Sequence, residues 1–453
     1  MKSTLTFLIF LFLLHTSFSQ SIEGEWTGEL SFAGNTLDLN FFIYKENEQY
    51  LSTLIVPAQS VNDFKSTSTS LVDSILTIEL KPLGITYKGK WSQLDAITGT
   101  FLQNGASLAL NLVRGNKKIN RPQEPKPPYT YHVEDVEFKN EIDGTNLAGT
   151  LTLPSQEGSF PAVILISGSG PQDRNSSILG HKPFLLLAHE LTQNGYAVLR
   201  YDERGVGESE GEFIEASLND FLEDARSAVH YLQRRPEVNS EQLGLLGHSI
   251  GGVIAPQLSI QEEISFLILL AAPGIDGDTM MLQQRADFLK LRGLTDQQIE
   301  QSNLIFKETY EFIRTTSANG SQFEVELRRF LKDNYSSNLM EKELETLVEQ
   351  LTSKELLGLL RNRPARYLNK VTCPVLALGG SKDFQVAATE NLEAIKNIVL
   401  KGGNSRVQLK EFDGLNHLFQ ECETGDLSEY GTIEQTMSPK VLEYILNWLN
   451  KSI

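Results

Sequence analysis

The sequence predicts a mostly parallel, doubly wound α/β sheet with a helical insertion, preceded by a small all-β domain. Continuous apolar runs such as residues 162–166 and 197–201 suit strands that are buried on both faces. Helical patterns separate these runs, as in a parallel sheet covered by helices. Residues 20–115 instead alternate apolar and polar side chains. The length of 453 residues allows about two to three domains.

Residues 1–19 have the order of a secretory signal peptide. Lys2 precedes an apolar run from Leu5 to Leu14, and small residues follow at Ser17 and Ser19. The run is too short to span a membrane. We expect cleavage after residue 19 and export to the periplasm or the exterior, with a buried N-terminal helix as the alternative. No later stretch approaches 18 apolar residues, so no membrane span is expected.

The all-β domain is predicted for residues 20–115, as a small antiparallel barrel or sandwich. Apolar residues recur at every second position in residues 37–43. The Gly-x-Trp start resembles calycin-type barrels such as lipocalins, and we expect Trp26 to plug the core rather than to bind a ligand. Residues 116–130 hold four prolines among charged residues, which is typical of an extended linker.

The α/β domain is predicted for residues 131–453. Residues 278–366 are rich in Glu, Lys, Gln, Leu and Arg at helical spacing, which indicates a helical cap inserted into the sheet domain. Strands are expected at 132–138, 147–153, 162–166, 197–201, 242–247, 265–271, 374–378 and 405–412, with helices near 182–194, 217–234, 250 onward, 386–398 and 439–451.

Composition excludes several partner classes. The net charge of −18 argues against nucleic acid or an anionic membrane surface, since both attract lysine and arginine. No His, Cys and Asp cluster has metal-ligand spacing, so a zinc site is not expected. Cys373 and Cys422 are either paired or free in an exported protein. The oligomeric state is not encoded in any of these features.

Ser249 lies in a Gly-x-Ser-x-Gly pattern, a motif that occurs by chance in roughly one chain in five of this length. Its context is more specific, because a predicted strand ends at residue 247 and a predicted helix begins at residue 250. A strand–serine–helix turn exposes the hydroxyl at the top of a sheet, and the flanking glycines avoid collisions there. We expect Ser249 to be a nucleophile, with His248 packed or hydrogen-bonded beneath it.

A serine nucleophile needs a base, which follows the serine along the chain in this topology. Of seven histidines, His417 alone lies C-terminal to Ser249, in a loop just past the last predicted strand. An acid must orient the imidazole. Asp383 follows the strand 374–378 and is the preferred candidate, while Asp276 and Asp278 lie one strand earlier.

The developing oxyanion needs two hydrogen-bond donors. We expect the N–H groups of Ile250 and Ser169 to supply them. Ser169 lies in the glycine-rich loop 167–174, where Gly170 is a further candidate substrate contact. A phosphate-binding loop is excluded because no lysine follows at the required spacing.

Arg204 has two interpretations. It is a fixed cation near the predicted site, so it is a candidate clamp for a substrate carboxylate. Alternatively, it forms a structural ion pair with Asp173 or Asp202. Asp173 and Arg174 are expected to anchor their loop rather than to take part in catalysis.

Residues 131–453 resemble the α/β-hydrolase superfamily. The resemblance rests on the ordered motifs SGSGPQDRN, RYDERGVGES, GHSIGG, AAPG, GGSKDFQV and GLNHLFQ. It points to a branch of secreted bacterial serine hydrolases and carboxylesterases, with serine-aminopeptidase-like and dienelactone-hydrolase-like relatives. Many relatives begin the oxyanion loop with His-Gly, whereas this chain has Ser167-Gly168, which puts the side-chain support of that loop in question.

These observations predict an exported serine hydrolase, most simply a carboxylesterase that acts on a small-molecule ester or amide. This serine-hydrolase chemistry implies neither a metal nor an organic cofactor. The cap 278–366 is expected to cover the site as a lid. A serine exopeptidase, an acyltransferase and a thioesterase are alternatives, because the fold does not define the substrate. A ligand-binding protein with a non-catalytic hydrolase domain is the alternative from another class.

Overall fold

The computed structural model describes residues 21–32, 35–47, 49–56, 61–92, 95–103, 105–115, 120–335 and 341–452. The chain divides into two compact units, Met1–Lys118 and Ile119–Ile453, each of which is considered by itself. The proposed signal peptide, residues 1–19, lies outside the described residues. Across the described ranges, no helix combines the length and the apolar character that a membrane span requires.

The described part of the first unit is an antiparallel sheet, as predicted for an all-β domain. The side chains of Ser52 on β3 and Thr69 on β5 hydrogen-bond each other (2.7 Å), so two strands that lie in opposite halves of the strand order given below contact each other. Trp26 is fully buried, as predicted, and its Nε1–H donates to Ile22 O (2.7 Å). The sheet order is β4-β3-β2-β1-β9-β8-β7-β6-β5, and the strands are β1 (Gly24–Phe32), β2 (Asn35–Glu46), β3 (Gln49–Val56), β4 (Val61–Lys65), β5 (Ser68–Val72), β6 (Ile75–Leu80), β7 (Ile85–Trp91), β8 (Ala96–Gln103) and β9 (Ala106–Arg114).

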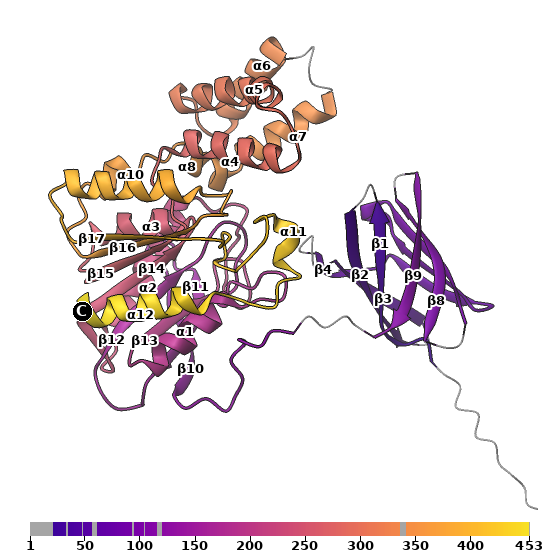
Figure 1. The fold of residues 1–453 in the computed structure, drawn as a ribbon, viewed down its shortest axis with the longest axis horizontal. Helices are drawn as coiled ribbons and strands as arrows, with labels where there is room; N and C mark the ends of the chain where they lie inside the picture. Colours follow the sequence, from indigo (N-terminus) through magenta and orange to yellow (C-terminus); the bar gives the residue numbers. More distant parts are fainter. Residues whose placement is uncertain are drawn as a thin grey trace, which may run out of the picture. The chain divides into compact units, whose positions relative to one another are not determined.

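The second unit is built on an eight-stranded sheet in the order β10-β11-β13-β12-β14-β15-β16-β17 (Figure 1). β10 and β11 run antiparallel to their neighbours, and the remaining pairs are parallel. The predicted doubly wound sheet is thus confirmed, with strands β10 (His132–Lys139), β11 (Asn146–Leu153), β12 (Phe160–Ile166), β13 (Ala197–Tyr201), β14 (Val238–His248), β15 (Phe266–Leu270), β16 (Val375–Gly380) and β17 (Val407–Phe412).

Helices cover both faces of this sheet because its central strands are apolar on both sides. Ile164 of β12 belongs to the apolar core that includes α2, α3 and α10, whereas Leu165 belongs to the core that includes α1 and α12 on the opposite face. Figure 1 shows α10 and α12 on opposite sides of the sheet. Their bounds are α1 (Pro183–Gln193), α2 (Leu218–Gln233), α3 (Gly251–Ser259), α10 (Ala388–Lys401) and α12 (Pro439–Ser452), and a short helix α11 (Leu427–Tyr430) follows β17.

The predicted cap is a separate helical layer inserted between β15 and β16. It has its own apolar core, in which Phe323, Leu327 and Val348 are almost fully buried. Its helices are α4 (Gly277–Leu291), α5 (Asp296–Thr315), α6 (Gly320–Tyr335), α7 (Glu341–Thr352), α8 (Lys354–Leu360) and α9 (Ala365–Leu368).

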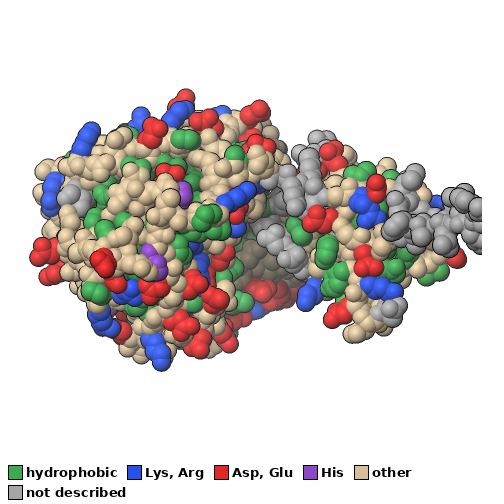
Figure 2. All heavy atoms as spheres, turned by 90° about the horizontal axis from the view of Figure 1, so that it is seen from below, with side chains coloured by type: hydrophobic (Ala, Val, Ile, Leu, Met, Phe, Trp, Pro, Cys, Tyr) green, Lys and Arg blue, Asp and Glu red, His purple; other side chains and the backbone are tan. Residues whose placement is uncertain are grey.

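The end of the proline-rich stretch is attached to the second unit. The guanidinium of Arg121 donates to the carbonyls of Leu179 and Gly431, and Gln123 bonds the backbone of Met437. Cys373 and Cys422 are both free thiols. On the face of the molecule in Figure 2, acidic and basic side chains are interspersed rather than segregated.

Candidate active site

Ser249 lies in a tight turn between β14 and α3. Its φ of 53° is uncommon for a residue with a side chain, and its N–H donates to Leu270 O (2.9 Å). A Cβ at Gly247 would lie 2.2 Å from Gly251 O, and a Cβ at Gly251 would lie 2.1 Å from Ile166 O. The predicted need for glycine at both positions is therefore confirmed: the turn packs against the end of β12 with no room for side chains.

His417 and Asp383 meet at the same edge of the sheet. His417 follows β17 and Asp383 follows β16, and the distance from His417 Nδ1 to Asp383 Oδ2 is 2.7 Å. The other carboxylate oxygen accepts the N–H groups of Gln385 and Val386, each at 2.9 Å. Since an ionised carboxylate can only accept hydrogen bonds, the imidazole proton lies on Nδ1 and leaves Nε2 as the basic nitrogen.

The two other candidate acids lie elsewhere. Asp278 pairs with Arg363 at 2.9 Å and Asp276 approaches the same guanidinium at 3.5 Å, where the cap joins the sheet domain. In the described residues, no hydrogen bond joins Ser249 Oγ to the His417 ring. Such bonds often form fully only when a substrate is bound.

His248 links the serine turn to the His417 loop. Its Nε2–H donates to the backbone carbonyl of His417 (3.0 Å), and the two imidazole centroids are 4.8 Å apart. Burial lowers the pKa of His248 to about 3, so the ring is neutral at physiological pH. The predicted packing of His248 beneath the site is confirmed, and the contact holds the backbone of His417 beside the turn that carries Ser249.

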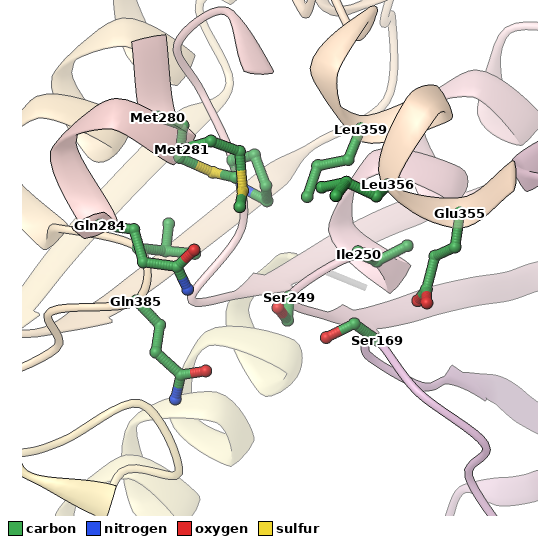
Figure 3. A pocket seen from close by; sticks show the side chains of 12 residues that line it. Ser169, Ser249, Ile250, Met280, Met281, Gln284, Glu355, Leu356, Leu359 and Gln385 are labelled. Carbon is green, nitrogen blue, oxygen red and sulfur yellow. The ribbon is translucent and has the colours of Figure 1, made fainter. Parts of the chain in front are cut away.

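The glycine-rich loop after β12 approaches Ser249 closely. A Cβ at Gly168 would lie 3.2 Å from the Cβ of Ser249. Ser169 and Ile250 line the same cavity as Ser249, so the structure brings the two predicted oxyanion donors to the nucleophile (Figure 3). The N–H of Gly170 instead donates to a carboxylate oxygen of Glu355 from α8 (3.0 Å).

A buried carboxylate, Glu203, supports both ends of this loop. Ser167 Oγ donates to Glu203 Oε1 (2.6 Å), and the N–H of Gln172 donates to Glu203 Oε2 (3.2 Å). The N–H of Glu203 in turn donates to Gln172 O (3.1 Å). The serine that replaces the histidine of many relatives therefore has a side-chain partner of its own. Burial raises the pKa of Glu203 to about 8.

The pKa of Glu203 predicts a pH-dependent stability. The folded protein holds this proton up to about pH 8, whereas the ordinary pKa of a glutamate side chain is 4.5, so the free energy of unfolding falls as pH rises between these values. We expect E203Q to weaken this fall, because glutamine can bond both loop ends without titrating. Urea unfolding at pH 5, 6.5 and 8 measures how the free energy of unfolding depends on pH. Glu212→Gln, at an exposed glutamate, is the control. An unchanged slope in E203Q would contradict the prediction.

The cavity beside Ser249 has a volume of about 170 Å³ and lies between the sheet edge and the cap. Met280, Met281 and Gln284 of α4 line one side, and Glu355 of α8 projects from the opposite side (Figure 3). Among the described residues that line it, Glu355 alone is charged. Burial raises the pKa of Glu355. The cap helices thus form walls of this cavity.

Arg204 lies away from that cavity, in a buried ion-pair cluster. Its guanidinium binds both carboxylate oxygens of Asp224 (2.6 and 2.7 Å) and also contacts Asp143 (2.9 Å). The predicted structural ion pair is confirmed, but the predicted partners, Asp173 or Asp202, were wrong: the carboxylate of Asp202 pairs with Arg174 instead (2.6 Å). Both carboxylates that bind Arg204 are remote from it in sequence, so no local pattern indicated them.

Asp173 and Arg174 anchor their loop, as predicted. The Asp173 carboxylate accepts the N–H groups of Asn175 and Ser177 (3.0 and 2.9 Å). Arg174 connects the loop to Asp202 at the end of β13.

Sequence reasoning did not single out Glu203 or Glu355. Glu203 lies within the motif RYDERGVGES, and the unusual Ser167 was the signal that its loop needed another support. Glu355 is one of many acidic residues on the amphipathic cap helices. Its position in the cavity depends on how α8 packs against the rest of the fold, and no local sequence pattern predicts that packing.

The sheet order and the serine turn between β14 and α3 define the protein as an α/β-hydrolase. A model of the family described as serine aminopeptidase, S33, matches residues 182–423. The chain belongs to this hydrolase family, and membership of it makes the protein an enzyme. The resemblance to the α/β-hydrolase superfamily seen in the sequence is thus confirmed.

The individual relatives are only distantly similar to this chain in sequence. The chain is 26% identical to esterase EstD of Thermotoga maritima over 337 residues, which cover 74% of this chain and 72% of the relative. It is 35% identical to the uncharacterised protein YfhR of Escherichia coli over 127 residues, 28% of this chain and 41% of the relative. Among solved structures, the Pyrococcus furiosus esterase Pf2001 matches with 17% identity and a TM-score of 0.44, covering 75% of this chain and 99% of that one.

Proposed function

We propose that the protein is an exported serine carboxylesterase that acts through an acyl-enzyme. The observation that carries the proposal is the His417–Asp383 pair, which lies at the sheet edge beside the turn that presents Ser249 to the cavity. The name of the EstD relative, an esterase, points in the same direction.

In the proposed reaction, Ser249 Oγ attacks the ester carbonyl carbon while His417 Nε2 takes the hydroxyl proton. The tetrahedral oxyanion receives hydrogen bonds from the N–H groups of Ile250 and Ser169. Collapse expels the alcohol, which takes the proton from His417 and leaves an acyl-Ser249 ester. Water then attacks this ester with the same proton transfers, which releases the acid and restores the enzyme.

Export is part of the proposal and rests on residues 1–19, which have the signal-peptide order. The cap is proposed to act as the lid of the site, since α4 and α8 contribute Met280, Met281 and Glu355 to the cavity wall. A small cavity that combines apolar side chains with several polar ones suits a small-molecule ester.

The experiment is hydrolysis of p-nitrophenyl esters of increasing acyl length by the protein without residues 1–19. We expect ester turnover with a burst, followed by a steady state, because acylation releases nitrophenol before water resolves the acyl-enzyme. Labelling of Ser249 by a fluorophosphonate, located by mass spectrometry, tests the nucleophile independently. Absence of both turnover and labelling would overturn the proposal.

A serine exopeptidase is the second candidate, favoured by Glu355. Its carboxylate faces the same cavity as Ser249 and has a raised pKa from burial, so a protonated substrate amine would relieve an unfavourable buried charge. Aminoacyl and prolyl nitroanilides test this. If the protein is a peptidase, E355Q should raise KM for the anilides more than for neutral esters. Equal effects on both substrate series would argue against amine recognition by Glu355.

A further inference from the structure

A second cavity adjoins the one at Ser249. It has a volume of about 290 Å³ and shares Met281, Gln284 and Gln385 with the first cavity. These shared residues lie on the side of Ser249 that is away from Glu355 (Figure 3). The two cavities therefore adjoin at these three side chains, and the second cavity is an extension of the site along the cap helix α4.

The walls of the extension are largely apolar. Phe288 from the cap and Phe384 from the loop after β16 pack against each other in its wall, with ring centroids 6.4 Å apart, and Leu427 of α11 adds a further apolar side chain. Tyr310 of α5 lines the cavity as well and is almost fully buried. Such a surface suits the hydrocarbon or aromatic arm of a substrate.

Arg285 is the one cation among the described residues that line this extension. Its Nη2–H donates to Ser302 Oγ (2.7 Å), and its guanidinium carbon lies 3.7 Å from the ring centroid of Phe306. Its Nε is buried without a hydrogen-bond partner. No carboxylate pairs with it among the described residues. By contrast, the nearby Arg292 pairs with Asp426 (2.9 Å).

An unpaired, half-buried guanidinium is costly because it loses hydration without gaining an opposite charge. Burial indeed lowers the pKa of Arg285, although arginine remains charged at any physiological pH. A carboxylate at the end of a bound substrate would supply the missing partner and can accept two parallel N–H bonds from the guanidinium fork.

Resting on the proposed esterase function, we propose that the substrate has an apolar arm ending in a carboxylate, which Arg285 binds. Arg285 is one helical turn beyond Met281 on α4, and Met281 lines both cavities. Measured along the axis of α4, the bound carboxylate would therefore lie about one helical turn, roughly 5–6 Å, beyond Met281 on the side away from Ser249. Arg204, which the sequence offered as a carboxylate clamp or as part of a structural ion pair, is saturated by Asp224 and Asp143.

Two substrate series test the proposal, since the anionic arm can belong to the acyl or to the alcohol part. The first comprises p-nitrophenyl monoesters of dicarboxylic acids of increasing length, and the second comprises acetate esters of ω-hydroxy acids. Each is compared with the matching methyl ester, which is neutral. We expect kcat/KM in one series to favour the free acid by about tenfold or more at the best chain length.

The variants R285Q and R285K separate charge recognition from a structural role. R285Q should abolish the preference for the acid while changing kcat/KM for neutral esters by less than about threefold, and R285K should retain part of the preference. R329Q, at an exposed arginine of α6, is the matched control and should retain it fully. If neutral esters are hydrolysed but R285Q leaves the acid-to-neutral ratio unchanged, Arg285 is not the clamp. If no ester is hydrolysed by the wild-type protein, the proposed function itself fails.

Discussion

Replacing Ser249 with alanine is expected to lower kcat for ester hydrolysis by about 10⁶-fold, to the level supported by the remaining binding and oxyanion groups. The loss is large because the acyl-enzyme cannot form without the hydroxyl, whereas the fold should be unaffected: Ser249 keeps its place through its backbone N–H to Leu270 O, which alanine retains. The measurement is steady-state and single-turnover hydrolysis of a p-nitrophenyl ester, with thermal unfolding to verify the fold.

Ser169→Ala is the matched control for this variant. The proposed role of Ser169 is its backbone N–H, and its side chain lies in the same cavity as Ser249. We expect S169A to retain activity within about tenfold, since alanine keeps the backbone N–H that we propose as an oxyanion donor. Full activity in S249A would instead identify the protein as something other than a serine hydrolase. If the wild-type protein shows no turnover and S249A binds ligand as well as the wild type does, the ligand-binding alternative is favoured.

Asp383→Asn is expected to lower kcat by about 10⁴-fold. The side-chain amide of asparagine has one oxygen acceptor, and the N–H groups of Gln385 and Val386 compete for it. The amide nitrogen then faces His417 Nδ1 as a donor, which selects the imidazole tautomer with the proton on Nε2. That tautomer cannot take the proton of Ser249.

The pH profile of the Asp383→Asn variant adds a second readout. Its residual activity should rise at high pH, where hydroxide takes over part of the role of the base, whereas a merely destabilised variant would lose activity in proportion to its folded fraction. Asp413→Asn is the control, because Asp413 is exposed in the neighbouring loop and hydrogen-bonds Ser381 rather than His417. Equal losses in both variants would show that Asp383 has no special relation to His417.

Local patterns in the sequence were sufficient to predict the architecture of the α/β domain. The strands of the second sheet carry continuous apolar runs because helices cover both faces, and the helices between them have a clear 3.6-residue period. The turn at Ser249 needs glycines at 247 and 251 for steric reasons that act within a few residues. His417 was identifiable because parallel topology places the ends of successive strands at one edge, and no other histidine follows the serine.

Contacts between distant segments were decided by the tertiary structure. Arg204 pairs with Asp224 and Asp143 rather than with the acidic residues nearest to it in its motif. Arg285 resembles any charged residue of a cap helix until the fold places it in a cavity where no carboxylate of the described residues pairs with it. A sequence pattern reports which face of an element is apolar, because burial repeats with the period of that element. It does not report which charges on separate elements meet, because those pairings depend on how the elements pack in three dimensions.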